Sequence, residues 1–324
     1  MNRSHFYRAI FAISLACTSA FAQAQPATWP NRAVRILVGF PAGSTPDSAA
    51  RALADGLSGV LGQPVIVENR SGASGNLAAD LVAKASDDHT LGVVINGNLT
   101  SAKILNPALP YDPARDFSYL SLLTTAPLAL VTRSDLPTGT AFFATATKQG
   151  DQWNYGSVGN GSVAHLGMEL LKSKVPGMKP VHIPFQGNPA VITGLLGGHI
   201  QMALVPPGLA LPHVKSGRLH IVGLTGGRST LAPDAPSLSE LGVNNLNLEV
   251  WTALVGPAKL SKAAQQRLAV EVPKLMRNAD VRQRLFIQGG WNSVGTAPDG
   301  LKTRVTEEAA IMKVIIKTAN IKND

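Results

Sequence analysis

Three glycine-rich segments carry the groups that could do chemistry in this sequence. They run from Phe40 to Asp47, from Ser71 to Asn76 and from Ser157 to His165. Each combines Gly with Ser, Thr or Asn, and each precedes a stretch in which apolar residues recur at helical spacing. The first N–H groups of a helix have no partner inside the helix, and Gly lets the backbone bend so that neighbouring N–H groups face one ligand. Such segments are typical of anion sites at helix N-termini.

The third segment also fits a cofactor motif. Residues 159–164 read GNGSVA, which matches the G-x-G-x-x-G/A pattern of dinucleotide-binding turns. A dinucleotide site needs an acidic residue about 20 positions further on, at the end of the next strand, to bind the ribose hydroxyl. The corresponding strand, residues 181–186, contains no Asp or Glu. We therefore predict that the protein binds no cofactor and that these N–H groups face an anion.

Motifs of enzymes and metal sites are absent from the sequence. It has no G-x-S-x-G, H-E-x-x-H or P-loop pattern, and the His residues lack metal-ligand spacing. Its single Cys excludes a disulfide framework or a Cys-based metal site. No nucleophile–base pair is recognisable, so we predict a binding protein with no catalytic residue and no metal. Two side chains keep alternative interpretations: Asp47 as a helix cap or a ligand contact, and His165 as helix packing or a ligand contact.

Alternating strands and helices position these segments. The predicted strands are residues 34–38, 65–67, 91–95, 128–131, 153–157, 180–185, 200–205, 219–224 and 246–255. The predicted helices are residues 50–61, 76–85, 162–171, 190–196, 263–276 and 301–316. Strands separated by helices indicate parallel sheets wrapped by helices, in which ligands bind at the carboxyl ends of the strands. The three segments lie in such strand-to-helix loops.

Composition excludes several classes of protein. The 324 residues suit one large or two medium domains, and 45% hydrophobic with 15% charged residues argues against disorder. The formal net charge is +9, but no run of five Lys or Arg occurs. We therefore predict no nucleic-acid partner and interpret the charge as mild attraction for anions.

The N-terminus has the pattern of a targeting segment. Two Arg residues precede a mostly apolar stretch, residues 9–20, and small residues then offer cleavage near Ala22 or Ala24. A lipoprotein signal at residues 14–17 fits less well, because Ser stands where an aliphatic residue belongs. No other stretch approaches the length of a membrane span. We expect an exported, soluble protein in the periplasm.

The segments also carry a family resemblance. Residues 40–51 resemble the first loop and helix of the substrate-binding proteins of tripartite tricarboxylate transporters, the Bug family. Similar segments follow in order along the mature chain at residues 67–76, 111–117, 157–165, 184–198 and 211–219. The resemblance implies an α/β type II periplasmic solute-binding protein with two lobes, parallel-rich sheets wrapped by helices, and a ligand cleft between the lobes. By that analogy the chain divides into a signal peptide (1–22), lobe 1 (25–125 plus 245–324) and lobe 2 (126–244).

The resemblance further implies how the ligand is held. Family members bind a carboxylate mostly with backbone N–H groups, hydroxyls and waters, and the candidate loops here contain no Lys. Many relatives have a second Gly where Ser44 stands, so Ser44 either narrows the pocket or adds a donor. Relatives often have an acid just after the strand at 200–205, and residues 204–208 have none, which favours a non-amino mono-, di- or tricarboxylate with an apolar or aromatic body. The candidate ligand-binding residues are Phe40, Ala42, Gly43, Ser44, Thr45, Ala73, Ser74, Asn76, Ser157, Asn160, Gly161, Ser162, His165, Phe185 and Val205.

The expected mechanism is capture by closure of the lobes. Only the closed form brings donors of both lobes to the ligand, so the ligand shifts the population toward closure. By family analogy the closed protein, a monomer, docks on a membrane permease with one large and one small subunit. Two alternatives stay open: a ligand receptor for a sensor kinase, and an exported hydrolase on the same fold.

Overall fold

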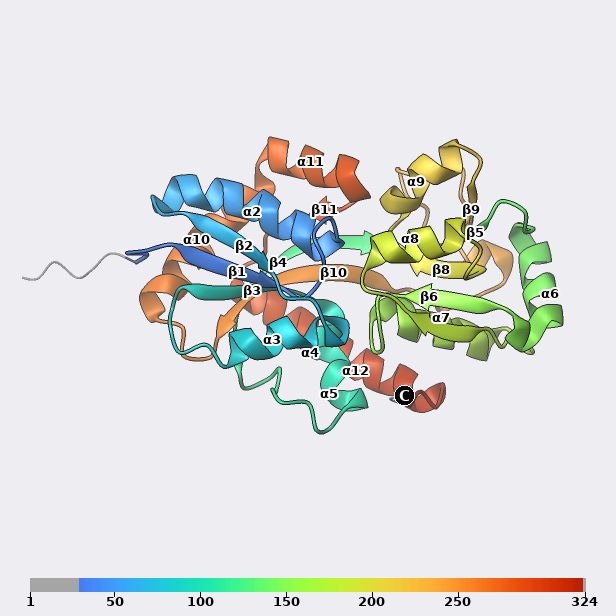
Figure 1. Ribbon diagram of the computed structural model, residues 1–324, viewed down its shortest axis with the longest axis horizontal. Helices are drawn as coiled ribbons and strands as arrows, with labels where there is room; N and C mark the ends of the chain where they lie inside the picture. The colour runs from blue at the N-terminus through green and yellow to red at the C-terminus, as the bar shows by residue number, and fades with distance from the viewer. Residues whose placement is uncertain (1–28, 323–324) are drawn as a thin grey trace, which may run out of the picture.

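The computed structural model describes residues 29–322, whose strands form two sheets that are each covered by helices (Figure 1). The predicted signal peptide lies outside these residues. The six-stranded sheet has the order β11-β4-β10-β3-β1-β2, and the five-stranded sheet has the order β7-β6-β8-β5-β9. We call the first sheet with its helices lobe 1, and the second sheet with its helices lobe 2.

The elements of lobe 1 come from both ends of the chain. Its strands are β1 (Val34–Val38), β2 (Val65–Asn69), β3 (Thr90–Ile95), β4 (Phe117–Pro127), β10 (Glu249–Pro257) and β11 (Asn292–Ser293). Its helices are α2 (Thr45–Leu61), α3 (Asn76–Ala83), α4 (Asn96–Thr100), α5 (Ala102–Leu105), α10 (Lys262–Arg277), α11 (Ala279–Gly289) and α12 (Pro298–Thr318). A 3-10 turn, η1 (Ala73–Gly75), precedes α3.

Lobe 2 is built from the middle of the chain. Its strands are β5 (Ala129–Arg133), β6 (Asn154–Ser157), β7 (Val181–Pro184), β8 (Met202–Val205) and β9 (Leu219–Leu224). Its helices are α6 (Gly139–Gln149), α7 (Val163–Lys174), α8 (Asn188–Leu196) and α9 (Pro207–Lys215), with 3-10 turns η2 (Gly150–Gln152) and η3 (Ser239–Leu241). None of the helices in residues 29–322 is long and apolar enough to span a bilayer.

Both sheets are mixed. In lobe 1, β1 pairs in parallel with β2 and β3, whereas β10 runs antiparallel to β3 and β4. In lobe 2, β6 pairs in parallel with β7 and β8, whereas β5 runs antiparallel to β8 and β9. The parallel pairs are those that the alternation of strands and helices predicts. The antiparallel strands β4, β5 and β10 flank the two places where the chain passes between the lobes.

Thr225 joins the two crossing segments. One crossing is at Leu128, between β4 and β5, and the other leads through Leu248 into β10. The Thr225 hydroxyl oxygen accepts a hydrogen bond from the Leu128 N–H (2.9 Å), and the hydroxyl donates to the Leu248 carbonyl (2.7 Å). Its own N–H donates to the Leu128 carbonyl (2.8 Å). Because Thr225 is 1% exposed, water does not compete for these bonds, and the crossings are held side by side at the hinge.

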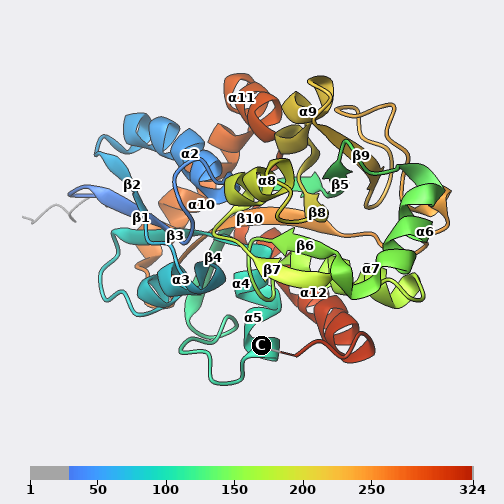
Figure 2. The same cartoon turned by 45° about the vertical axis from the view of Figure 1, so that its right-hand side comes forward.

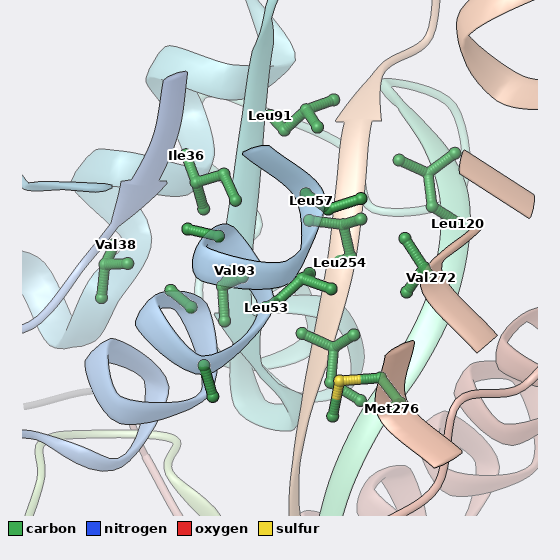
Figure 3. Close-up of a cluster of buried hydrophobic side chains, with 14 of the residues drawn as sticks. Ile36, Val38, Leu53, Leu57, Leu91, Val93, Leu120, Leu254, Val272 and Met276 are labelled. Atoms are coloured by element: carbon green, nitrogen blue, oxygen red, sulfur yellow. The ribbon is translucent and has the colours of Figure 1, made fainter. Parts of the chain in front are cut away.

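One core cluster of lobe 1 lies between the sheet and the helices α2 and α10. Leu53 and Leu57 of α2, four positions apart on one face, pack with Ile36, Val93 and Leu254 of the strands (Figure 3). This packing fixes α2 directly after β1 and so places the first glycine-rich segment at the carboxyl end of β1.

Helix α12 contributes to both lobes. Leu301 and Val305 belong to a core cluster of lobe 1, whereas Met312 and Ile315 pack in the core of lobe 2. With 21 residues the helix is roughly 30 Å long, enough to reach from one lobe to the other. The chain beyond β10 therefore does not belong to lobe 1 alone.

Candidate ligand-binding site

The N-termini of five helices meet at one small cavity between the lobes. From lobe 1, the cavity is lined by the first residues of α2 and α4; from lobe 2, it is lined by the first residues of α7 and α8 and by Pro206 just before α9. Figures 1 and 2 show the N-termini of α2 and α8 facing each other across the gap between the lobes. The cavity volume is about 30 Å³, which holds about two water molecules.

Helix dipoles give this cavity a positive potential. The unpaired N–H groups at a helix N-terminus act as roughly half a positive charge. Within residues 29–322, the side chains that line the cavity include no Lys, Arg, Asp or Glu. The positive potential thus comes from main-chain groups of both lobes, and an anion is the ligand it favours.

Two residues that line this cavity each carry a buried side-chain atom that lacks a hydrogen-bond partner. The hydroxyl of Ser44 is on a residue that is 1% exposed, and the side-chain oxygen of Asn96 is on a residue that is 0% exposed. Neither atom has a partner within the described part of the chain, and both residues line the cavity. A buried polar group left unpaired costs about 1–3 kcal/mol, so a ligand or water that bonds these atoms would recover that free energy.

The first glycine-rich segment divides between cavity and surface. Phe40, Ser44 and Thr45 line the cavity. Ala42 and Gly43 are exposed and stand outside it. Ser44 is the N-cap residue of α2, but its side chain makes no capping bond, so its hydroxyl is available to a ligand.

Asp47 has a structural role in this segment. Its carboxylate accepts hydrogen bonds from the Gly43 N–H (2.9 Å), from Arg51 (3.0 Å) and from Asn69 (2.9 Å). Burial alone would raise the pKa of Asp47, but these hydrogen bonds outweigh burial and lower the pKa. Both the carboxylate and the Gly43 N–H are therefore occupied within the protein, which favours a structural role over ligand contact. The bonds are not those of a helix cap, because none of them involves a main-chain N–H group of α2.

The second segment lines a hollow that adjoins the cavity. Ala73 and Ser74 line this hollow, whose volume is about 150 Å³, together with Phe185 from lobe 2. Phe40 and Val158 line both spaces and so stand between them. Ala73 and Ser74 have φ angles of 48° and 56°, a left-handed turn that brings this loop against lobe 2.

Asn76 supports the second segment from behind. Its side-chain oxygen accepts hydrogen bonds from Asn98 (2.8 Å) and from the Tyr111 hydroxyl (2.7 Å). Asn98 also donates to the main-chain carbonyl of Ser74 (3.0 Å), which ties the loop to α4. Burial raises the pKa of Tyr111, so this hydroxyl stays a donor. Asn76 is outside the cavity and the hollow, and its role in the structure is to hold the loop.

The third segment touches the cavity through the start of α7. Ser162 lines the cavity, and its hydroxyl caps α7 by accepting the His165 N–H (3.2 Å). The Gly161 N–H donates to the His165 ring (3.2 Å), and the Gly161 carbonyl accepts the hydroxyl of Ser101 from lobe 1 (2.5 Å). Asn160, Gly161 and His165 do not line the cavity. His165 instead braces the loop.

Ser157 and His182 form a nucleophile–base pair that the sequence did not reveal, because the two residues are 25 positions apart. The Ser157 hydroxyl lies 2.7 Å from the His182 Nε2 atom. Burial, followed by electrostatic interactions with His165 and Lys172, lowers the pKa of His182 to about 3, which makes it a weak base at neutral pH. Ser157 is 1% exposed, its oxygen also accepts the Gly159 N–H (3.0 Å), and neither partner lines the cavity or the hollow. The pair holds the loop together.

Val205 is placed in the core of lobe 2 and does not reach the cavity. It is 0% exposed, whereas its neighbours Leu204 and Pro206 line the cavity. Successive side chains of a strand point to opposite faces. Because Leu204 faces the cavity, Val205 lies on the other face of β8.

Two asparagines line the cavity but are not among the ligand-binding residues predicted from the sequence. Asn96 follows β3 directly, and Asn188 follows a Gly after β7; both begin helices at the cavity. The rule that ligands bind at the carboxyl ends of strands applies to these loops too, and would have identified them. Leu128 and Val250 of the crossing segments complete the floor of the cavity.

A larger hollow of about 570 Å³ lies beside the crossing segments, lined by Pro127 and Glu249. Its Arg side chains are already paired: Arg304 with Glu249 (3.1 Å) and Arg228 with Glu240 (2.7 Å). None of the three glycine-rich segments reaches it. In residues 29–322 no group of His, Cys, Asp and Glu could hold a metal ion.

Two lobes that are joined by two crossing segments and meet at an anion-attracting cavity define a solute-binding protein. Residues 49–321 match the model of the tripartite tricarboxylate transporter family receptor, and the chain belongs to this family. The predicted family and the predicted two-lobed α/β fold are thereby confirmed.

Individual relatives agree with this assignment. A UPF0065 protein from Cupriavidus necator is 33% identical over 300 residues, which cover 88% of each chain. The structure of Rpa4515 from R. palustris with adipate is similar with a TM-score of 0.86 and 26% identity, covering 91% of this chain and 99% of that one. MatC from Rhodopseudomonas palustris with bound malate is similar with a TM-score of 0.82 and 29% identity, covering 89% and 100%.

Proposed function

We propose that this protein captures a small carboxylate between its lobes in the periplasm and delivers it, unaltered, to a membrane permease. The observation that carries the proposal is the meeting of helix N-termini from both lobes at a cavity whose described lining has no charged side chain. The adipate and malate in the two similar structures support a carboxylate as the anion. The family's description as a transporter receptor supports a permease as the partner.

The carboxylate is held mainly by uncharged donors. The Ser44 hydroxyl is unpaired, and the Thr45 hydroxyl oxygen accepts the Asn188 side chain (3.3 Å), which leaves the Thr45 hydroxyl proton free to bond the ligand. The main-chain N–H groups that open α2, α7 and α8 add their dipoles. The body of the ligand extends past Phe40 toward the hollow lined by Phe185.

Closure of the lobes encloses the ligand. Thr45 contacts Asn188 across the cleft, and Ser101 bonds Gly161 across it, so the lobes already touch. A cavity of about 30 Å³ is too small for a dicarboxylate. Entry therefore requires the lobes to part about the hinge at Thr225, and the ligand favours the form in which both sets of donors reach it.

Calorimetric titration tests the proposal. We expect heat of binding with plain mono-, di- or tricarboxylates and none with matched amides, which keep the shape but lose the charge. Small-angle scattering should show compaction when the bound acid is added. Binding of aspartate or glutamate alone would contradict the non-amino ligand, and equal binding of acids and amides would contradict an anion site. Mass spectrometry before and after incubation should recover the acid unchanged, which an enzyme would not allow.

A further inference from the structure

The side-chain amide of Asn96 is held in one orientation. Its nitrogen donates to the main-chain carbonyl of Glu249 (3.1 Å) and to the carboxylate of Glu308 (2.9 Å). A carbonyl and a carboxylate are both acceptors, so the nitrogen must face them, and both of its N–H groups are then used. The oxygen of the amide is on the opposite side, is buried, and has no partner within residues 29–322. Asn96 is among the residues that line the cavity, and this unpaired oxygen is the part of its side-chain amide that is not committed to Glu249 or Glu308.

Glu308 is itself held in place. It is 6% exposed, and its second oxygen accepts the indole N–H of Trp251 (2.5 Å) and lies 3.4 Å from the Nε atom of Arg304. Trp251 is 0% exposed. With donors on both oxygens, the Glu308 carboxylate cannot turn away from Asn96. Glu308, more than 200 positions away in the sequence, is thus the group that aims Asn96.

A fixed acceptor selects among ligands by chemistry. The Asn96 oxygen repels a carboxylate oxygen, which is also an acceptor, and bonds an O–H or N–H group. An ammonium group is disfavoured, because helix N-termini surround the cavity and because apolar side chains such as Phe40 and Val250 would strip its water. A neutral hydroxyl on an otherwise anionic ligand satisfies both requirements.

We propose, resting on the proposed function, that Asn96 is a specificity-determining residue that selects carboxylates bearing a hydroxyl group, and that Glu308 is its positioning residue. The ligand's carboxylate lies toward the helix N-termini and the Ser44 hydroxyl, while its hydroxyl donates to the Asn96 oxygen. An acid of the same skeleton without the hydroxyl leaves that oxygen unpaired.

Matched acids test the selection. Wild-type protein is titrated with succinate and malate, with butyrate and 3-hydroxybutyrate, and with propane-1,2,3-tricarboxylate and citrate. For the pair of the preferred chain length, the hydroxy acid should bind about ten- to a hundredfold more tightly. Equal affinities within every pair would overturn the inference and leave the proposed carboxylate function standing. No binding of any acid would overturn the proposed function itself.

Variants test the two residues. Asn96→Leu should bring the affinity ratio of the pair to within about threefold of unity, with little change for the acid that lacks the hydroxyl. Glu308→Gln should lower the same ratio, because the single amide oxygen of Gln must then accept from both Asn96 and Trp251. Glu307→Gln, at the exposed neighbouring position, should leave the ratio unchanged. An unchanged ratio in Asn96→Leu overturns the inference. If Asn96→Leu does not fold, equal ratios in the two Glu variants overturn it.

Discussion

The side chain of Asn188 in lobe 2 donates a 3.3 Å hydrogen bond to the hydroxyl of Thr45 in lobe 1. Each residue is the first of its helix, and both helices begin at the same cavity. The contact therefore joins two positive helix ends directly, an arrangement that costs electrostatic free energy unless an anion lies between them. An anionic ligand would relieve this repulsion, and closure would be coupled to its capture.

Ser44→Ala should separate stability from binding. Since the Ser44 hydroxyl is buried without a partner, its removal should leave the free energy of unfolding unchanged or raise it by up to about 1 kcal/mol. Affinity for the captured acid should fall about tenfold, because the ligand loses a donor. Urea unfolding and calorimetry measure the two effects. Ser162→Ala is the contrasting variant: its hydroxyl caps α7, so this change should destabilise the protein by about 1 kcal/mol.

Gly159→Ala should hinder closure. A Cβ atom at this position would lie 2.1 Å from the Ser74 hydroxyl oxygen of the other lobe, and the φ angle of 122° disfavours any side chain. We expect affinity roughly tenfold lower, since less of the protein populates the closed form. Scattering should show a less compact protein with ligand present.

Two controls accompany this variant. Gly227→Ala, where a Cβ meets nothing, should bind like wild type. Combining Gly159→Ala with Ser74→Gly removes the clash and should restore part of the affinity. If the double variant binds no better than the single one, backbone strain and not the contact between lobes explains the loss.

Thr225→Val should loosen the hinge. The change leaves the Leu128 N–H and the Leu248 carbonyl without their partner in a buried site, so the free energy of unfolding should fall by about 2–4 kcal/mol. Chemical denaturation measures the loss, and the exposed Thr230→Val serves as the matched variant. A difference below about 0.5 kcal/mol between the two would show that Thr225 does not join the crossings energetically.

His182 should make stability depend on pH. Its pKa is about 3 in the folded protein, lowered first by burial and then by His165 and Lys172, whereas an unfolded chain has a His pKa near 6.5. As pH falls from roughly 6.5, the unfolded chain gains a proton that the folded protein does not, so stability is lost toward acid pH. His182→Phe keeps a flat ring against His165 and should flatten the decline in Tm between roughly pH 6.5 and 4.5. In the control variant His199→Gln, at an exposed position, the Tm should decline over this pH range as steeply as in wild type.

The sequence predicted the strands whose apolar pattern is local, but it missed β4. Strand β4 contains Ser121 and Thr124, which are buried yet satisfied: Ser121 donates to the Thr296 carbonyl (2.8 Å), and Thr124 bonds Thr252 (2.7 Å). These partners are more than a hundred positions away, and two irregularities in the pairing with β10 further break the alternation. A polar residue in a central strand cannot be recognised until its distant partner is known.

The same limit applies to the site. The glycine-rich segments lie at the interface of the lobes, where the family resemblance implied a ligand cleft, but which of their residues reach the cavity depends on distant contacts. The Gly43 N–H donates a hydrogen bond to Asp47, and the Asn76 side chain accepts one from Tyr111. The Ser44 hydroxyl, by contrast, has no partner within the described residues. Asn96 gains its orientation only from Glu308. Sequence patterns indicate the loops, whereas tertiary hydrogen bonds determine which of their residues remain available to a ligand.

Helix α12 has a consequence for the order in which the protein matures. The sheet of lobe 2 is complete by Leu224, yet its core is filled by Met312 and Ile315. A nascent or translocating chain that has emerged only as far as β9 still exposes the apolar surface that these side chains cover. Lobe 2 can therefore complete its native packing only after α12 has been made, so the two lobes reach their native packing together.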